Sequence, residues 1–310
     1  MTTLLMTQPK ISQHLTPSGH SERPERLVAI ETALSANKFS ELKREISTSA
    51  DLKLGELVHS RDVLKTLQNT RPAEGIAAID GDTYLSPQSL DVAATALGAG
   101  MRALQSVAMG EADNAFCAIR PPGHHAEKNR SMGFCLLNTV AILARLAQQM
   151  YGAERIAIID FDVHHGNGTQ DIFYQDKSVF YASSHEMPLF PGTGKANETG
   201  VGNICNVPLS AGSDGEQMRQ AYLDVIFPAL NNFSPDFLLI SAGFDAHHLD
   251  PLANLNWNGD DYAWLTGKIM DIADQKCGNR IVSLLEGGYD LEGLASGVSN
   301  HVRMLDKGSL

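Results

Sequence analysis

The sequence contains no long hydrophobic run, few basic residues and few cysteines, and each shortage excludes a class of protein. No stretch of about 18 consecutive apolar residues occurs, so we expect no membrane-spanning helix. The first residues, MTTLLMTQPK, lack the basic and long apolar segments of a secretory signal peptide. Lysine and arginine number 24 against 36 aspartates and glutamates, for a net charge of -12. This charge disfavours binding to a nucleic acid backbone and favours cationic partners.

The four cysteines, Cys117, Cys135, Cys205 and Cys277, are scattered and form no CxxC pair. Three of them lie in apolar or glycine-flanked segments, as is typical of small core residues. The pattern fits a reducing compartment and gives no indication of thiol catalysis. We therefore expect a cytoplasmic protein that binds neither membranes nor nucleic acid.

Short apolar runs alternate with segments of helical character along the chain. Five runs are candidate strands: residues 114–119, 155–160, 178–183, 236–242 and 280–286. Helices are predicted over residues 138–150 and 215–230, and residues 1–90 look mostly helical, with the strongest amphipathic segment at 21–34. Nearly continuous apolar strands that alternate with helices are typical of a parallel sheet covered on both faces. We therefore predict one α/β domain over residues 1–310, without a repeat or linker that divides it.

Polar segments rich in glycine follow all five predicted strands. They carry aspartate, histidine or tyrosine, and seven of the eleven histidines fall in four of them. Because the carboxyl ends of parallel strands meet at one edge of a sheet, ligands of such folds bind among these loops. We therefore expect the five segments to form one site.

The stretch RIAIIDFDVHHGNGTQ, residues 155–170, ends a predicted strand in ionisable side chains. If the extended conformation continues past the strand, residues two apart share a face, which places Asp160, Asp162 and His164 together. Two carboxylates and an imidazole at a buried strand end are costly unless a cation lies between them. Carboxylate oxygens with one imidazole suit zinc or ferrous iron. A hydrogen-bonded polar network that caps the strand is the alternative interpretation.

A catalytic zinc ion takes three protein ligands and keeps one position open. Asp162 and His164 supply two ligands, and Asp245, one short turn past its strand in SAGFD, is the best placed third ligand. Three neighbours remain alternative ligands, although a solvated loop is the simpler interpretation of the segment: His247, His248 and Asp250.

Two further segments carry groups suited to acid–base chemistry and to oxyanion binding. PPGHH places His124 and His125 after a rigid turn, where they can contact different substrate atoms as general base and general acid. EGGY places Tyr289 after two glycines, and its hydroxyl can donate a hydrogen bond to a developing oxyanion. Structural histidines, or a turn followed by a core tyrosine, would explain either segment alone. The hypothesis that these residues are catalytic therefore depends on both segments occurring in the same sequence as the predicted metal ligands.

These segments resemble the histone deacetylase family, which includes bacterial deacetylases and acetylpolyamine amidohydrolases and shares an arginase-type α/β fold. Eight motifs match in the order of the family: GHSERPERL (19–27), DGDTYLSP (80–87), RPPGHHA (120–126), GFCLLN (133–138), DFDVHHGNGTQ (160–170), FPGTG (190–194), SAGFDAHHLDPL (241–252) and LEGGYDLEGL (285–294). HHGNGTQ, with Asn167 where one branch of the family carries aspartate, and SAGFD resemble the class II branch.

The resemblance implies two ion sites. Asp162, His164 and Asp245 match the zinc ligands of the family. A structural potassium ion is implied at Asp160 and at the backbone near Ser183.

The resemblance also implies catalytic roles. His124 and His125 are implied to transfer protons, and Tyr289 to polarise the acyl carbonyl. Asp160 is implied to hold His124, and Asn167 matches the partner of His125. Because an amide cannot raise imidazole basicity as a carboxylate would, His125 is expected to suit acid catalysis. Which histidine is the principal general base stays open.

Five positions match residues that contact substrate in the family. Gly133, Phe134 and Phe190 match the lining of a narrow tunnel that grips the aliphatic stem of an acyl-lysine. Asp82 matches a rim aspartate that accepts hydrogen bonds from a peptide backbone. Leu252 occupies the position at which polyamine-selective members carry a glutamate, and a leucine cannot pair with a secondary ammonium group.

The implied activity is a zinc-dependent removal of acetyl, or another acyl group, from the ε-amine of lysine in proteins or peptides. A histidine takes a proton from water, Tyr289 stabilises the oxyanion, and a histidine protonates the leaving amine. The products are acetate and a free amine.

Three other functions share features with this one. An acetylpolyamine or other small acyl-amine amidohydrolase would use the same chemistry, and the net charge of -12 would attract its substrate. Leu252 disfavours this function. The resemblance also implies that bacterial polyamine enzymes carry a longer insertion that mediates dimerisation, for which 310 residues leave little room. A ureohydrolase with two manganese ions would need a second cluster of aspartate and histidine ligands. A silent reader of acyl-lysine would be expected to lack a zinc ligand or Tyr289, and the sequence retains both. Zinc against ferrous iron, acyl-chain length and oligomeric state stay open.

Overall fold

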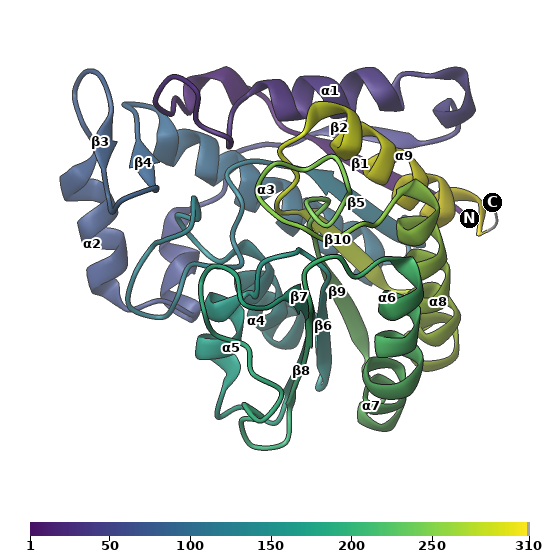
Figure 1. Cartoon of the computed structure of the whole chain (residues 1–310). Coiled ribbons are helices and arrows are strands. Elements are labelled where there is room, and N and C mark those ends of the chain that lie inside the picture. Colours follow the sequence, from purple (N-terminus) through teal and green to yellow (C-terminus); the bar gives the residue numbers. More distant parts are fainter. Residues whose placement is uncertain (309–310) are drawn as a thin grey trace.

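A central parallel sheet of eight strands organises the structure, a computed structural model that describes residues 1–308. The strands lie in the order β2-β1-β5-β10-β9-β6-β7-β8 (Figure 1). Their bounds are β1 (Thr3–Thr7), β2 (Lys43–Ile46), β5 (Asn114–Ala118), β6 (Ile156–Asp160), β7 (Val179–Glu186), β8 (Ile204–Leu209), β9 (Phe237–Ala242) and β10 (Ile281–Leu285). A separate antiparallel pair joins β3 (Ala77–Ala78) to β4 (Tyr84–Leu85).

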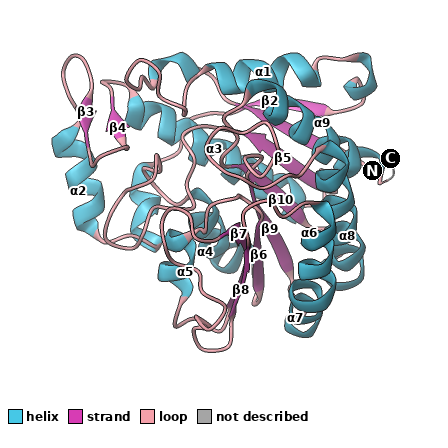
Figure 2. Cartoon of the chain, in the orientation of Figure 1, coloured by secondary structure: helices cyan, strands magenta, loops and turns pink. Residues whose placement is uncertain are grey.

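Helices cover both faces of the sheet (Figure 2). They are α1 (Glu25–Leu34), α2 (Arg61–Thr70), α3 (Ser89–Ala108), α4 (Thr139–Tyr151), α5 (Asn167–Phe173), α6 (Gly215–Ala221), α7 (Phe227–Phe233), α8 (Gly259–Cys277) and α9 (Leu291–Lys307). Short helical turns are η1 (Ile11–Gln13), η2 (Asn37–Phe39), η3 (Leu52–Leu57) and the π-helical turn η4 (Tyr222–Ile226), which joins α6 to α7. Helices α3 and α4 pack together on one face, and α8 and α9 pack together on the other. No helix within residues 1–308 is long and apolar enough to cross a membrane.

The predicted parallel α/β fold is confirmed, but the prediction for residues 1–90 was incomplete. Each of the five predicted strands overlaps a strand of the sheet, namely β5, β6, β7, β9 and β10. The prediction missed β1 and β2 in the N-terminal segment and β8 at the opposite edge. The two edge strands lack a continuous apolar run, because β2 alternates between partly buried and exposed residues and β8 contains Pro208.

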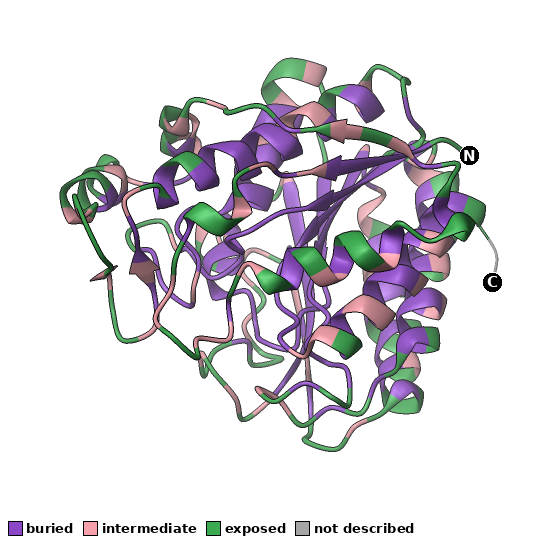
Figure 3. Cartoon of the chain, turned by 90° about the horizontal axis from the view of Figure 1, so that it is seen from above, coloured by how far each residue is buried: buried purple, intermediate pink, exposed green. Residues whose placement is uncertain are grey.

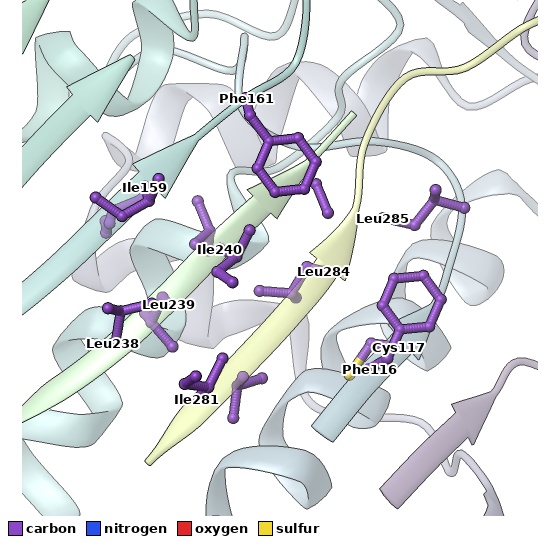
Figure 4. Close-up of a cluster of buried hydrophobic side chains, with 14 of the residues drawn as sticks. Phe116, Cys117, Ile159, Phe161, Leu238, Leu239, Ile240, Ile281, Leu284 and Leu285 are labelled. Atoms are coloured by element: carbon purple, nitrogen blue, oxygen red, sulfur yellow. The ribbon is translucent and has the colours of Figure 1, made fainter. Parts of the chain in front are cut away.

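Four central strands form the rigid base of the molecule. Every residue of β5, β6, β9 and β10 is buried, and these strands form the purple centre of Figure 3. Figure 4 shows Ile159, Ile240 and Leu284 from three neighbouring strands within one apolar cluster. Burial of each such side chain contributes about 1.5–3 kcal/mol. Phe161, one residue past β6, points into the same cluster, where its ring centroid lies 5.9 Å from that of Phe244.

The loops that carry the predicted site begin at one end of these strands. Because all the strands run in the same direction, the segments after β5, β6, β7, β9 and β10 emerge together, and long loops gather in front of the central strands in Figure 2. Capping residues start the helices that lead away from these loops. Asn138 accepts a hydrogen bond from Ala141 N at the start of α4, at 3.0 Å, and Asp290 accepts one from Gly293 N at the start of α9, at 2.7 Å.

A buried histidine beneath these loops makes the stability of the fold depend on pH. His301 of α9 is fully buried, and its ring nitrogens lie 2.6 Å from Thr266 Oγ1 and 2.9 Å from Ser283 Oγ. Burial lowers the pKa of His301 to about 3. The same side chain in an unfolded chain titrates near a pKa of about 6.5. The unfolded state therefore binds the extra proton, and stability falls as the pH drops from about 6.5 toward 3.

We expect His301 to account for a loss of about 2 kcal/mol in the free energy of unfolding between about pH 7.5 and pH 5. His301→Gln can bond both hydroxyl groups but does not titrate, so its loss over this range should be smaller by about the same amount. Urea unfolding of both proteins at the two pH values measures the difference. Equal losses in the two proteins would contradict this assignment.

Candidate active site

Three buried side chains from two loops meet at the end of the sheet. Asp162 and His164 follow β6, and Asp245 follows β9. A carboxylate oxygen of Asp162 and one of Asp245 each lie 3.2 Å from His164 Nδ1. One potential ligand atom from each residue lies within 4.8 Å of the others. Within residues 1–308, these three side chains lie close enough together that they could hold a metal ion.

The charges of this group favour a bound cation. Asp162, Asp245 and His164 are 0%, 1% and 8% exposed. Burial lowers the pKa of His164, but the two carboxylates outweigh it and raise the pKa to about 10. Burial and the neighbouring Asp162 raise the pKa of Asp245 to about 7. Two buried carboxylates therefore need a positive charge between them, and a divalent cation supplies more of it than one imidazolium does.

Two glycines and two backbone N–H groups hold the carboxylates in place. A Cβ atom at Gly243 would overlap the carboxylate of Asp162, and one at Gly287 would overlap that of Asp245. Gly287 N donates to Asp162 Oδ2 at 2.8 Å, and Val163 N donates to Asp245 Oδ1 at 2.9 Å. These contacts leave the remaining carboxylate oxygens directed toward His164, as a metal site requires.

His124 lies between two of the buried carboxylates. Its Nδ1 lies 3.0 Å from Asp160 Oδ2, and its Nε2 lies 3.8 Å from Asp162 Oδ2. Tyr181 donates its hydroxyl hydrogen to the same Asp160 oxygen at 2.9 Å. Burial lowers the pKa of His124, but Asp162 and Asp160 outweigh it and raise the pKa to about 10. His124 is therefore the member of the histidine pair whose charged form the neighbouring carboxylates favour.

His125 has a different partner, and its pKa is shifted in the opposite direction. Its Nδ1 lies 2.8 Å from Asn167 Oδ1, which leaves Nε2 as the available ring nitrogen. Burial and the neighbouring His124 lower the pKa of His125 well below its usual value. The surroundings therefore favour the charged form of His124 and the neutral form of His125, whose ring centroids lie 4.0 Å apart. A neutral His125 suits proton acceptance, which differs from the expectation that it suits acid catalysis.

A pocket of about 240 Å³ leads to this cluster. It is lined by Asp82, His125, Gly133, Phe134, His164, Leu189, Phe190, Leu252 and Tyr289. All five residues predicted to contact substrate are in this lining, and Leu189 is an addition that the sequence analysis missed. Gly133 and Phe134 adopt positive φ angles of 58° and 66°, a conformation that is uncommon for phenylalanine and directs this turn into the pocket wall.

Asp250 connects two walls of the pocket. Its Oδ2 accepts hydrogen bonds from Tyr289 N at 2.6 Å and Asp290 N at 3.2 Å, and its Oδ1 accepts one from Leu252 N at 3.0 Å. The Tyr289 ring lies 5.7 Å from the Phe134 ring and 4.8 Å from the Arg26 guanidinium carbon. Asp250 thus holds the backbone of both Tyr289 and Leu252.

The other predicted residues lie beside the candidate metal-binding group rather than in it. Ser183 pairs with Asp160 across β6 and β7, and its hydroxyl lies 2.9 Å from His185 Nδ1. Within the described chain, the candidate metal-binding group contains none of the three alternative ligands, which are His247, His248 and Asp250. His248 is exposed, and Asp250 binds backbone N–H groups instead.

The structure also brings distant residues to the site whose roles the sequence analysis missed. Arg26 donates to the backbone carbonyls of Glu286 and Gly288 at 2.5 and 2.6 Å. The carboxylate of Glu286 accepts hydrogen bonds from Gly123 N at 2.6 Å and His124 N at 3.1 Å. The motifs GHSERPERL and LEGGYDLEGL contain Arg26 and Glu286, but neither motif shows that the two segments meet.

Comparisons with known proteins agree on one family. The model of the histone deacetylase domain matches residues 20–305. An uncharacterized protein of Synechocystis sp. is 41% identical over 299 residues, which cover 94% of this chain and 96% of that protein. The histone deacetylase-like amidohydrolase of Pseudomonas aeruginosa is 34% identical over 279 residues, which cover 88% and 73% of the two chains. The crystal structure of the HDA15 HD domain superimposes with a TM-score of 0.92 and 33% identity, over 98% of this chain and 88% of that one.

We expect Asp250→Ala to lower the free energy of unfolding by about 3 kcal/mol, because it leaves three backbone N–H groups in a mostly buried site without their acceptor. Asp250→Asn keeps one acceptor oxygen of the same shape, so its loss should be about half as large. Urea unfolding of the three proteins measures both values. Unchanged stability of Asp250→Ala would show that the carboxylate does not hold these two segments together.

Proposed function

The chain belongs to the histone deacetylase family of amidohydrolases, and we propose that it is a zinc-dependent deacylase acting on the ε-amine of acyl-lysine in proteins or peptides. The observation that carries the proposal is the group of Asp162, His164 and Asp245 beside two histidines at a pocket lined by aromatic residues. The acetyl group is the acyl group that the family name indicates, and other acyl groups are included in the proposal.

Zinc suits the donor set of this site. Asp162, His164 and Asp245 offer two carboxylates and one imidazole, the number of protein ligands that a catalytic zinc ion takes. Ferrous iron accepts the same ligands and is the alternative metal. A bound zinc ion supplies Lewis acidity to an acyl carbonyl and lowers the pKa of water. A structural potassium ion at Asp160 and the backbone near Ser183 remains a prediction.

The residues around this group perform the proton transfers. The ring nitrogens of His124 and His125 take a proton from the attacking water and return one to the leaving amine. Burial raises the pKa of Tyr289 well above its usual value, so its hydroxyl keeps the hydrogen that it donates to the oxyanion. Asp160 and Asn167 hold the two imidazoles at Nδ1. The products are a carboxylate, which is acetate for an acetyl substrate, and a free amine.

The pocket favours a lysine side chain. Gly133, Phe134 and Phe190 provide a narrow, largely apolar lining for an aliphatic stem. Asp82 lies in the same lining, where a carboxylate can accept hydrogen bonds from a peptide backbone. Leu252 offers no charge to a secondary ammonium group, which disfavours acetylpolyamines. An acetylpolyamine or other small acyl-amine amidohydrolase is the second candidate, since an acidic chain attracts polycations.

We expect the protein to bind one zinc ion per chain and Asp245→Asn to lower zinc affinity more than roughly 100-fold, because even residues that only orient ligands contribute 10- to 100-fold. Competition with a chromogenic chelator measures the affinity. The control is His248→Gln, an exposed neighbour that should keep the affinity of the wild type. Equal zinc affinity in Asp245→Asn and the wild type would contradict the proposed metal site.

We expect the zinc-loaded protein to hydrolyse an acetyl-lysine fluorogenic peptide faster than N-acetylputrescine. Tyr289→Phe should lower kcat by roughly 100- to 1000-fold while zinc is retained, because it removes one donor to the oxyanion. Leu252→Glu should shift the ratio of kcat/KM values toward acetylputrescine, because it introduces a charge that pairs with the ammonium group.

Steady-state kinetics of the three proteins on both substrates measures these effects. A preference of the wild type for acetylputrescine would support the second candidate. No turnover of either substrate by the zinc-loaded wild type would contradict both.

A further inference from the structure

The side chain of Asn167 bridges a histidine of the pocket and a carboxylate near the surface. Its Oδ1 lies 2.8 Å from His125 Nδ1. Its Nδ2 donates to Glu127 Oε1 at 2.6 Å and lies 3.3 Å from Met132 Sδ. Asn167 and His125 are 4% and 5% exposed, so water has little access to this contact. The amide therefore has no free rotation between its two neighbours.

Glu127 decides which way the amide points. An ionised carboxylate only accepts hydrogen bonds, and a thioether sulfur is a weak acceptor, so both neighbours of Nδ2 require an N–H group there. The amide oxygen must then face His125 Nδ1, and that nitrogen must carry a hydrogen. A neutral His125 ring consequently has its lone pair on Nε2, the nitrogen that is not held by Asn167.

Glu127 is itself held from several directions. Its carboxylate accepts hydrogen bonds from Arg130 Nε at 2.8 Å and Nη2 at 3.1 Å. Its backbone N donates to Arg130 O at 2.9 Å, and its carbonyl oxygen lies 2.8 Å from His59 Nδ1. Asn138 N donates to His59 Nε2 at 2.9 Å, so His59 Nδ1 carries the hydrogen and donates it to Glu127. The carboxylate is therefore fixed although its side chain is 22% exposed.

We propose that Glu127 is a positioning residue that orients the amide of Asn167 and thereby keeps Nε2 of His125 free to accept a proton. The inference rests on the proposed function, in which a histidine takes a proton from water. If the amide turned over, its NH2 group would face His125 Nδ1, the ring hydrogen would move to Nε2, and the neutral ring would present a donor to the substrate. A catalytic histidine held in the wrong tautomer loses turnover by orders of magnitude.

Glu127→Lys tests the proposal by replacing the acceptor with a group that only donates. Glutamine would not do so, because Glu127 Oε1 accepts from both Asn167 Nδ2 and Arg130 Nη2, and an amide oxygen at that position would keep both bonds. The lysine ammonium group offers Asn167 only N–H groups. Asn167 must turn its oxygen toward that group and its own NH2 group toward His125. We expect kcat on the acetyl-lysine peptide to fall roughly 10- to 100-fold. KM and zinc content should not change, because the residues that line the pocket and bind the metal are retained.

A second substitution should restore the original tautomer. In Glu127→Lys/Asn167→Asp, the lysine ammonium group donates to the aspartate, and the aspartate accepts the hydrogen of His125 Nδ1. The double variant should therefore recover most of the lost kcat. Glu56→Lys is the matched control, because it makes the same change of charge in a surface pair, in which Arg61 Nε lies 3.1 Å from Glu56 Oε2, and neither residue lines the pocket. Its kcat should equal that of the wild type.

Nitrogen-15 chemical shifts of the His125 ring report the tautomer without any substrate. We expect the hydrogen on Nδ1 in the wild type and in the double variant, and on Nε2 in Glu127→Lys. A wild-type ring protonated on Nε2 would overturn the proposal, and this result does not require a folded variant. A Glu127→Lys protein with unchanged tautomer and kcat, or a loss of kcat that the double variant does not restore, would also overturn it. If the wild type hydrolysed neither substrate, the proposed function would fail while the spectra still decided the role of Glu127.

Discussion

Two carboxylates buried beside a single imidazole, where β6 and β9 end, impose the main constraint on this molecule. Removing Asp162 and Asp245 from water is costly unless donors and a cation compensate their charge. Backbone N–H groups of Gly287 and Val163 supply part of that compensation, and Gly243 and Gly287 lack the Cβ atoms that would displace the carboxylates. The glycine-rich turns after β9 and β10 follow from this requirement. A parallel sheet satisfies it because its strands deliver both loops to the same edge.

Each histidine of the site belongs to its own series of hydrogen-bonded side chains, and the two series differ in where they contain a carboxylate. His124 contacts the buried carboxylate of Asp160, which also receives the hydroxyl group of Tyr181. His125 contacts the amide of Asn167, and a carboxylate enters only one residue further away, at Glu127. A carboxylate stabilises an imidazolium directly, whereas an amide transmits only a direction of hydrogen bonding. Neighbouring residues of one motif can therefore have pKa values shifted in opposite directions.

The sequence predicted which side chains gather at the site better than it predicted the distant residues that hold them in place. Asp162, His164 and Asp245 could be selected because they follow apolar strands at short spacing, and the structure brings them together. The same reasoning could not choose between Asp245 and its neighbours except by position. The contacts of Arg26 with Gly288 join residues 262 positions apart, and no local period encodes such a pair. Edge strands β2 and β8 escaped prediction because strands with one unpaired side need no continuous apolar run.

The amino-acid sequence by itself determined the parallel α/β class, the ends of the central strands and the kinds of side chain that follow them. These properties depend on local periodicity and residue type, which the chain carries within short segments. Only the tertiary structure decided which loops meet, because β10 inserts between β5 and β9 although it is the last strand in the chain. That order places Glu286 against Gly123, and the guanidinium group of Arg26 over the ring of Tyr289. Hydrogen-bond direction, as in the contact of Glu127 with Asn167, likewise depends on neighbours that only the fold supplies.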